Sequence, residues 1–388
     1  MAFAVTIDAA RWRDHQDAVC GAVRRAAQAP LVPVIKGNGY GLGQRLLADE
    51  SIRLAADTVA VGTVFEVDKV AEYGTFDIIV LEPFDPRDEF AADAWWRLGQ
   101  QLHAGRVIRT IASKEALLAL AGGHGSIRVI LEAQTSMRRF GFDETELLRV
   151  LADPGVRDAF ARGRVLAEGL AVHLPLAQPA DEVEPRGADV GSPRVREVVR
   201  WAGLWDSETD VWSGHNSPAS RLWVSHLDDS EMAAVVRAVP DIVLRPRIGT
   251  RLWLGDRTAL HASGTVLAVH PLPAGTHVGY RQRTGPKDGT LVVVSGGTAH
   301  GIGLSAPTPG SNVRQRVVTA GTGALDAAGR ALSPFRWAGK QRWFAEPPHQ
   351  HVSMVWLPKG CVIPAVGDRM SAEVRFTTSR FDAVLGLM

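Results

Sequence analysis

The sequence predicts a (β/α)8 barrel of the TIM type followed by a C-terminal all-β domain, because the pattern of apolar residues changes near residue 256. Within residues 30–255, eight short apolar runs rich in Val and Ile alternate with segments of helical period. This alternation is typical of parallel strands joined by helices. From about residue 256 the helical periods nearly vanish, and β-like runs are separated by Gly and Pro. We therefore place the barrel in residues 1–255 and the β domain in residues 256–388, and residues 1–10 are assigned to either one.

The predicted barrel strands are continuous apolar runs, as expected of strands that are buried on both faces. They cover residues 31–37, 58–63, 76–83, 106–113, 127–133, 166–174, 221–227 and 242–249. Apolar residues recur with helical spacing in the segments between them. These segments are residues 45–57, 89–105, 114–123, 143–154, 193–205 and 229–240. The predicted strands of the β domain are residues 264–271, 289–297, 350–358 and 369–378.

The composition excludes several classes of function. The chain has 388 residues, of which 46% are hydrophobic, and its net charge is +1. The near-zero charge argues against a nucleic-acid or acidic-membrane partner, either of which requires a basic surplus. Cys20 and Cys361 lie far apart in the chain and form neither a disulfide framework nor a paired zinc motif. No apolar run is long enough to span a membrane, so a cytoplasmic location is expected.

A lysine followed by a glycine-rich turn is the first candidate functional feature. Lys36 ends the first predicted strand in PLVPVIKGNGYGLGQ (30–44), at the barrel face where active sites form. Apolar neighbours lower the pKa of a lysine and favour the neutral amine that Schiff-base chemistry needs. The glycines let the backbone approach a ligand, and Tyr40 offers a hydroxyl to a phosphate. The alternative is a strand-end lysine that reaches water before a flexible turn.

The stretch VIKGNGYGLG resembles the pyridoxal-phosphate lysine motif of the alanine racemase family, fold type III, whose members combine a barrel with a C-terminal β domain. The resemblance implies that Lys36 carries pyridoxal 5'-phosphate and that Tyr40 contacts its phosphate. TSMRRFGF (135–142) resembles the family's TGM-x-RLGF, which implies that Arg139 lies near the cofactor's phenolic oxygen and the substrate carboxylate. Seven residues earlier the family often has a carbamylated lysine. Glu132 takes that place here and supplies the carboxylate without modification.

Two further matches concern the cofactor ring. LAEGLAVHLPLA implies that His173 lies near the ring. RPRIGTRLWLG resembles the family's R-x-G-I-A-x-Y-G, which implies that Arg247 faces the pyridine nitrogen and that the backbone N–H groups of Gly249 and Thr250 lie near the phosphate. Arg245, two residues before Arg247, shares its strand face and remains an alternative.

A serine is implied at the phosphate from the seventh predicted strand. Ser225, in WVSHLD, occupies the end of that strand, where the family has a phosphate-binding serine. Ser217, in HNSP, is the rival, because the stretch before the strand is irregular. The sequence leaves the choice between the two serines open.

The resemblance also supplies a second acid–base group. GTHVGYRQR resembles the segment with the family's catalytic tyrosine and therefore points to Tyr280. In the family this tyrosine reaches the barrel of the partner subunit, so the resemblance implies a head-to-tail homodimer with shared active sites. Racemisation needs a proton removed from one face of Cα and returned to the other. Lys36 and Tyr280 would serve the two faces, while Arg247, a permanently charged donor, would disfavour protonation of the pyridine nitrogen.

Several residues at the predicted substrate entrance depart from the family pattern. Thr298 and His300 replace a tyrosine and an aspartate in GGTAHG, and Gln350 takes the place of a methionine. The resemblance therefore predicts an amino-acid racemase whose substrate is something other than alanine, or alanine together with another amino acid.

The pair His349 and His351 raises an alternative function. Residues two apart on a strand point to one face, so both imidazoles could bind one divalent metal ion. The stretch PPHQHVS also resembles the metal-assisted D-serine dehydratase and D-threonine aldolase group of fold type III. A pyridoxal-phosphate lyase or aldolase acting on a D-β-hydroxy amino acid is therefore the second hypothesis. A non-catalytic cofactor-binding homologue is the third.

Overall fold

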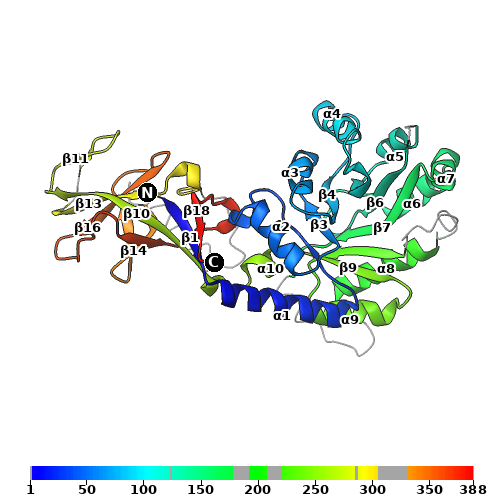
Figure 1. The fold of residues 1–388 in the computed structure, drawn as a ribbon, viewed down its shortest axis with the longest axis horizontal. Coiled ribbons are helices and arrows are strands. Elements are labelled where there is room, and N and C mark those ends of the chain that lie inside the picture. The colour runs from blue at the N-terminus through cyan, green and yellow to red at the C-terminus, as the bar shows by residue number, and fades with distance from the viewer. Residues whose placement is uncertain are drawn as a thin grey trace. The chain divides into compact units, whose positions relative to one another are not determined.

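The computed structural model confirms the predicted fold class, a barrel followed by a β domain (Figure 1). It describes residues 2–122, 125–177, 192–207, 220–284, 287–304 and 331–387. The chain divides into two compact units. Residues 14–39 and 44–255 form the barrel unit, and residues 1–13, 40–43 and 256–388 form the β unit.

The barrel unit contains an eight-stranded parallel sheet whose strand order follows the chain from β3 to β9, with β2 beside β9. A parallel bridge between Val34 and Ala60 joins β2 to β3 and closes the barrel. The strands are β2 (Val32–Pro33), β3 (Thr58–Val61), β4 (Asp77–Pro83), β5 (Val107–Ile111), β6 (Ile127–Ala133), β7 (Val165–His173), β8 (Arg221–Ser225) and β9 (Val243–Ile248). Each one coincides with a predicted apolar run, and β7 begins one residue before its run.

Helices flank these strands (Figure 1). They are α1 (Ala9–Ala27), α2 (Gln44–Arg53), α3 (Val67–Ala71), α4 (Glu89–Leu98), α5 (Lys114–Ala121), α6 (Glu144–Leu151), α7 (Pro154–Ala161), α8 (Pro193–Ser207), α9 (Asp229–Ala238) and α10 (Thr250–Leu254). Side-chain N-caps explain several of their starting points. Asp88, Ser113, Asp143 and Asp228 each accept a hydrogen bond from a backbone N–H group in the first turn of the following helix. No helix in the described ranges has both the length and the apolar character that crossing a bilayer requires.

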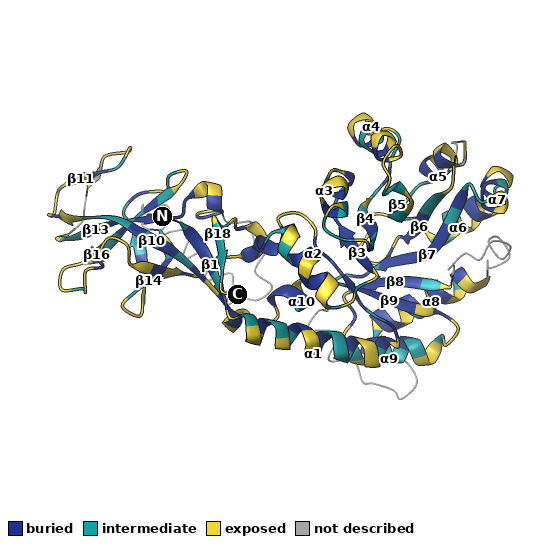
Figure 2. Ribbon diagram, in the orientation of Figure 1, coloured by how far each residue is buried: buried dark blue, intermediate teal, exposed yellow. Residues whose placement is uncertain are grey.

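The strands of the barrel are mostly buried (Figure 2). Its central layer is an apolar cluster of Val32, Val34, Ala60, Ile79, Ile108, Ile130, Ala171 and Trp223. Because alternate residues of a strand face the same side, the residues two positions before and after this cluster also point into the barrel. On β6 these positions are Arg128 and Glu132, and on β8 they are Arg221 and Ser225, so these two strands have a polar residue on either side of the apolar layer.

An ion-pair network forms the layer at the N-terminal ends of the strands. Arg128 binds Asp77 at 2.7 Å and Glu168 at 2.6 Å, and Arg221 binds the second oxygen of Glu168 at 2.8 Å. Arg245 pairs with Asp57 in the same layer, and Nη1 lies 3.0 Å from the carboxylate. Three arginines therefore meet three carboxylates, so the charges within this network cancel.

The β unit is built on a second eight-stranded sheet, in the order β13-β16-β15-β14-β17-β10-β1-β18, and an extra pairing of β13 with β10 closes part of it. Its strands are β1 (Phe3–Ile7), β10 (Leu260–Leu272), β13 (Gly289–Ser295), β14 (Leu332–Trp337), β15 (Lys340–Phe344), β16 (Val352–Pro358), β17 (Arg369–Ala372) and β18 (Ala383–Leu385). A separate hairpin joins β11 (His277–Val278) to β12 (Arg283–Thr284). The core of the sheet includes Phe3, Val266, Phe335 and Met370, so the N-terminal strand packs with this unit.

Candidate active site

Lys36 lies just beyond β2, at the C-terminal end of the barrel, and two residues past Val34 of the apolar layer. Its side chain is exposed, yet the surrounding protein still reduces its hydration. Its pKa is lowered from the ordinary value by this partial burial and then by the positive charges of Arg139 and Arg247, while Glu66 acts in the opposite direction. The neutral amine, which is the nucleophilic form, is therefore favoured.

The glycines after Lys36 have structural reasons of their own. Gly39 and Gly41 have φ values of 60° and 84°, in the left-handed region. A Cβ at Gly39 would lie 2.6 Å from the backbone nitrogen of Gln44, and one at Gly41 would lie 2.6 Å from the carbonyl oxygen of Phe376. Close approach within the protein thus explains these two glycines, which we had attributed to a ligand.

A buried carboxylate and two arginines extend the site. Glu132, near the end of β6, is buried, and its Oε1 lies 4.0 Å from Nη2 of Arg139. Burial raises the pKa of Glu132, and the charges of Arg247 and Arg139 oppose this shift. Arg247, on β9, is only 5% exposed, and its Nε and Nη2 atoms have no hydrogen-bond partner. A buried guanidinium with unused donors is costly unless a ligand accepts from it.

The two ends of the barrel interior differ in charge. At the C-terminal end, Lys36, Arg139 and Arg247 act on one another electrostatically, and Glu132 is the buried carboxylate beside the arginines. Glu66 is a second carboxylate that acts on Lys36. Three cations therefore meet two carboxylates here, whereas the network at the opposite end pairs three arginines with three carboxylates. This surplus of positive charge suits an anionic ligand.

His173 and Ser225 pair in register at the ends of β7 and β8. They lie two residues past Ala171 and Trp223 of the apolar layer, so both point into the barrel at its C-terminal end. The pKa of His173 is lowered to about 2 by burial and by the nearby positive charges, with Arg247 the largest of them. His173 is therefore a neutral imidazole at physiological pH. Ser217, the rival serine, lies outside the described residues.

The sequence analysis missed His226, which directly follows Ser225. Its ring centroid lies 5.0 Å from that of His173, at 89°. Its backbone is left-handed, with φ 67°, and its carbonyl accepts a hydrogen bond from Arg194 at 3.1 Å. Arg194 is buried in a bidentate pair with Glu231. Burial and then the charges of Arg247 and Lys36 lower the pKa of His226. The only signal in the sequence was its position next to Ser225.

The loop after β9 leads directly into α10. Gly249 is the N-cap residue of this helix, and Thr250 begins it. Trp253 anchors the helix by donating from its indole nitrogen to the carbonyl of Val34 at 2.8 Å. Arg245, the alternative to Arg247, is engaged with Asp57 in the balanced layer, so its charge is already matched.

Tyr40 belongs to the β unit, in the segment 40–43. Its φ is 55°, and burial raises the pKa of its hydroxyl to about 12. The hydroxyl therefore stays protonated and can donate a hydrogen bond to an anion.

Most of the predicted site residues of the β unit lie on two segments that hydrogen-bond to each other. Thr298 and His300 lie on a short 3-10 helix, and the backbone N–H of Thr298 donates to the carbonyl of His349 at 2.8 Å. The backbone of Ala299 bonds in the same way to that of Gln350. Tyr280 lies in the turn between β11 and β12 and is 86% exposed.

The prediction that His349 and His351 share one strand face is wrong. Strand β16 begins at Val352, and the N–H of His349 bonds to the carbonyl of Val352, so both histidines lie in a turn. His349 pairs with Glu346, whereas the ring of His351 lies 6.1 Å from that of His300. The described residues contain no group of three or more His, Cys, Asp or Glu side chains placed to hold a metal ion. These residues therefore do not fit a divalent metal.

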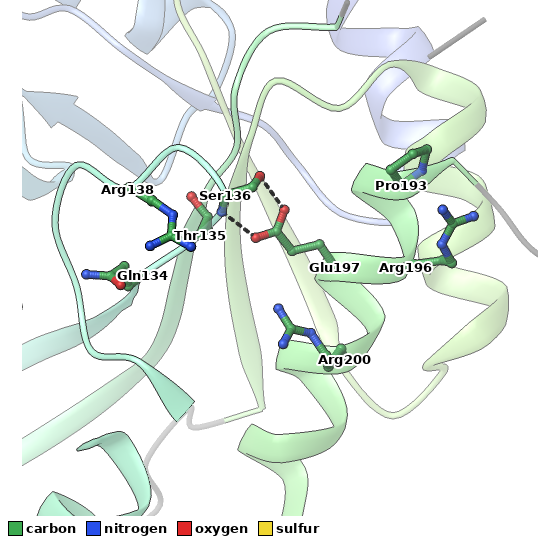
Figure 3. A pocket seen from close by; sticks show the side chains of 8 residues that line it. All are labelled: Gln134, Thr135, Ser136, Arg138, Pro193, Arg196, Glu197 and Arg200. Carbon is green, nitrogen blue, oxygen red and sulfur yellow. Dashed lines mark hydrogen bonds between the residues drawn. The ribbon is translucent and has the colours of Figure 1, made fainter. Parts of the chain in front are cut away.

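A polar cavity of about 470 Å³ lies beside the loop that follows β6 (Figure 3). The backbone N–H and hydroxyl of Ser136 hold Glu197 of α8 at 2.6 and 2.7 Å. Arg138 and Arg200 also line the cavity, and Arg200 pairs with Glu144. None of the predicted catalytic residues lines it.

The two units define a barrel protein with a lysine-centred site and a C-terminal β domain. A sequence profile of the alanine racemase N-terminal domain matches residues 7–237. The chain therefore belongs to the alanine racemase family.

Relatives and solved structures agree with this assignment. The chain is 29% identical over 290 residues to an alanine racemase of Nitratidesulfovibrio vulgaris (strain DP4), a match that covers 71% of this chain and 70% of the relative. Its fold resembles the crystal structure of alanine racemase from E. faecalis, with a TM-score of 0.61, 18% identity, and coverage of 96% and 88% of the two chains. It also resembles histidine racemase from Leuconostoc mesenteroides subsp. sake, with a TM-score of 0.54, 19% identity, and coverage of 95% and 87%. These findings support an enzyme of the amino-acid racemase class.

Proposed function

We propose that the protein is a pyridoxal-phosphate-dependent amino-acid racemase. The observation that carries the proposal is the unmatched positive charge at the C-terminal end of the barrel, above all buried Arg247 with two unpartnered nitrogen atoms. A phosphorylated pyridine aldehyde satisfies these features together. Its phosphate supplies negative charge, its ring nitrogen accepts a hydrogen bond, and its aldehyde reacts with a neutral lysine.

The residues of the site would divide the binding of the cofactor among them. Lys36 would hold it covalently, and Arg247 would donate to its ring nitrogen. Ser225, Tyr40 and the loop that begins at Gly249 would receive the phosphate. This assignment agrees with the general preference of barrels for binding phosphate in the loops after their last two strands, here β8 and β9, beside a short helix. The bound cofactor would delocalise the negative charge left when the α-proton departs.

The acid–base chemistry falls to two groups on opposite faces of the substrate. The neutral Nζ of Lys36 would take or return the α-proton on one face, and Oη of Tyr280 on the other. We propose that Tyr280 comes from a second copy of the chain in a head-to-tail dimer. Arg139, with Glu132 beside it, would bind the substrate carboxylate. Because Arg247 keeps its proton, the ring nitrogen would remain unprotonated.

We leave the substrate side chain broader than alanine. Thr298, His300 and Gln350 stand where the alanine racemase pattern has other residues. Proteins with this fold include racemases of amino acids as different as alanine and histidine. A panel of L- and D-amino acids therefore belongs in the test.

The decisive experiment combines absorbance with isotope exchange. The protein loaded with pyridoxal phosphate should show an absorbance band at about 420 nm. When it acts on its substrate in deuterated water, the amino acid should gain deuterium at Cα as both enantiomers accumulate. Lys36→Ala should lose the band, whereas Lys69→Ala, an exposed lysine on α3, should keep it. Release of ammonia or an aldehyde in place of racemisation would indicate a lyase. No band in the wild-type protein would contradict the cofactor assignment.

A further inference from the structure

A buried carboxylate lies directly behind the backbone of Tyr280. Glu346 is only 2% exposed, and its two oxygens accept long hydrogen bonds from the backbone nitrogens of Tyr280 and Arg281, at 3.3 and 3.5 Å. Gly279 permits this approach. Its φ is +71°, and a Cβ there would lie 1.8 Å from the carboxyl carbon of Glu346. The turn that presents Tyr280 is thus built around a carboxylate more than sixty residues later in the chain.

His349 connects this carboxylate to the tyrosine side chain. Its Nε2 contacts Oε1 of Glu346, and its ring centroid lies 4.4 Å from that of Tyr280, with a tilt of 35°. The imidazole therefore has one edge fixed by Glu346 and one face against the phenol ring. Two aromatic rings at this separation attract each other by about 0.5–1.5 kcal/mol beyond the area they bury.

Burying Glu346 is costly and needs an explanation. A carboxylate loses hydration when it is buried, and this loss is offset only by good hydrogen bonds. Among the described residues, the side-chain hydrogen bonds of Glu346 lead to the Tyr280 turn and to the ring that packs on Tyr280. The arrangement therefore fixes the place of a tyrosine that is itself 86% exposed and would otherwise sample several rotamers.

We propose that Glu346 and His349 are positioning residues that orient the hydroxyl of Tyr280 for proton transfer at Cα. The proposal rests on the function proposed above, in which Tyr280 is one of the two acid–base groups. Displacing a reacting group by about 1 Å can cost about 100-fold in rate, which is the scale of effect expected from a tyrosine that is no longer held. Binding of the substrate carboxylate, assigned to Arg139, should be unaffected.

The test measures deuterium exchange at Cα separately from the L and the D enantiomer of the best substrate. Tyr280→Phe defines the enantiomer that depends on Tyr280. His349→Ala should lower kcat for that same enantiomer about 10- to 100-fold with KM within about twofold. His349→Phe, which retains a ring against Tyr280, should recover most of the loss. His270→Ala, at an exposed position on β10, is the matched control and should behave as wild type.

Double variants separate positioning from a general loss of structure. In the Tyr280→Phe background, His349→Ala should add no further effect, because residues that act through one another are not additive. Glu346→Gln keeps hydrogen-bonding capacity without the charge and should lose activity for the same enantiomer only. Equal loss for both enantiomers, additive losses, or unchanged kcat in His349→Ala would overturn the positioning role. Normal exchange in Tyr280→Phe would instead overturn the assignment of Tyr280, and the positioning role with it.

Discussion

Because His173 is neutral in the folded protein, we predict that the protein loses stability as the pH falls, by an amount that follows from the pKa of His173. Its pKa is lowered to about 2 in the folded protein, chiefly by burial and then by Arg247 and Arg139. In the unfolded chain its pKa returns to about 6.5. Between these values the native state binds fewer protons at this site than the unfolded chain does, so stability falls as the pH falls.

The magnitude can be worked out from this difference. Each pH unit below about 6.5 costs about 1.4 kcal/mol for one such histidine, which gives about 2 kcal/mol at pH 5. Partial exposure of the ring to water reduces this figure, so we expect about 1–2 kcal/mol. For a unit of this size that corresponds to a shift in Tm of about 2–8 °C.

The assay compares apoprotein melting at pH 7 and pH 5 for wild type, His173→Asn and His261→Asn. His261 is an exposed histidine on β10 and serves as the control. The acid-induced drop in Tm should be smaller in His173→Asn than in the other two proteins. Histidine NMR should show that the His173 ring does not titrate above about pH 5. Equal drops in all three proteins, or a titration midpoint near 6.5, would refute the reasoning.

Three further predictions concern other parts of the molecule. Glu168→Gln should lower the free energy of unfolding by about 2–4 kcal/mol in urea titrations, because two arginines lose a charged partner. Asp49→Asn, at an exposed position, should lower it by under about 0.5 kcal/mol. Gly41→Ala should destabilise more than Gly43→Ala by thermal melting, since both have positive φ but only Gly41 meets backbone within 4 Å. Asparagine tolerates the left-handed backbone at position 226, so His226→Asn should weaken pyridoxal-phosphate binding about tenfold in absorbance titrations without disturbing the fold. Equal losses of stability within either of the first two pairs of variants, or unchanged cofactor affinity in His226→Asn, would contradict these expectations.

Local patterns were sufficient to predict the barrel strands, but not every element of the chain. Short apolar runs that alternate with segments of helical period indicate buried parallel strands, and all eight strands were predicted. Helix α1 was not among the predicted helices. Strands β14 and β15 were also missed, since Arg, Lys and Trp give them no clear alternation of apolar and polar residues. The predicted helix over 89–105 ends at Leu98, where Gly99 is the C-cap residue.

In the candidate site, too, residues placed by the pattern of their own strand could be predicted, whereas contacts between distant segments could not. Glu132, His173 and Ser225 each lie two residues past a core residue, so strand periodicity alone places them at one end of the barrel. Glu346 could not be found in this way, because its contact with the Tyr280 turn joins segments 66 positions apart. The error at His349 has a local cause, because the N–H of His349 bonds to the carbonyl of Val352 in a turn and strand β16 begins only at Val352.

The charges inside the barrel are paired differently at its two ends. At one end, Glu168 joins two arginines in a network whose charges cancel, which is how a protein normally pairs buried ions. At the other end, Arg247 remains buried with unused donors, and Lys36 and Arg139 add to the repulsion. Such an arrangement lowers the stability of the protein, and an anion that binds at this end would offset the loss. The same barrel thus has one layer in which the buried charges are paired and a second layer in which positive charge is left unpaired. The second layer includes Lys36, the lysine of the glycine-rich motif.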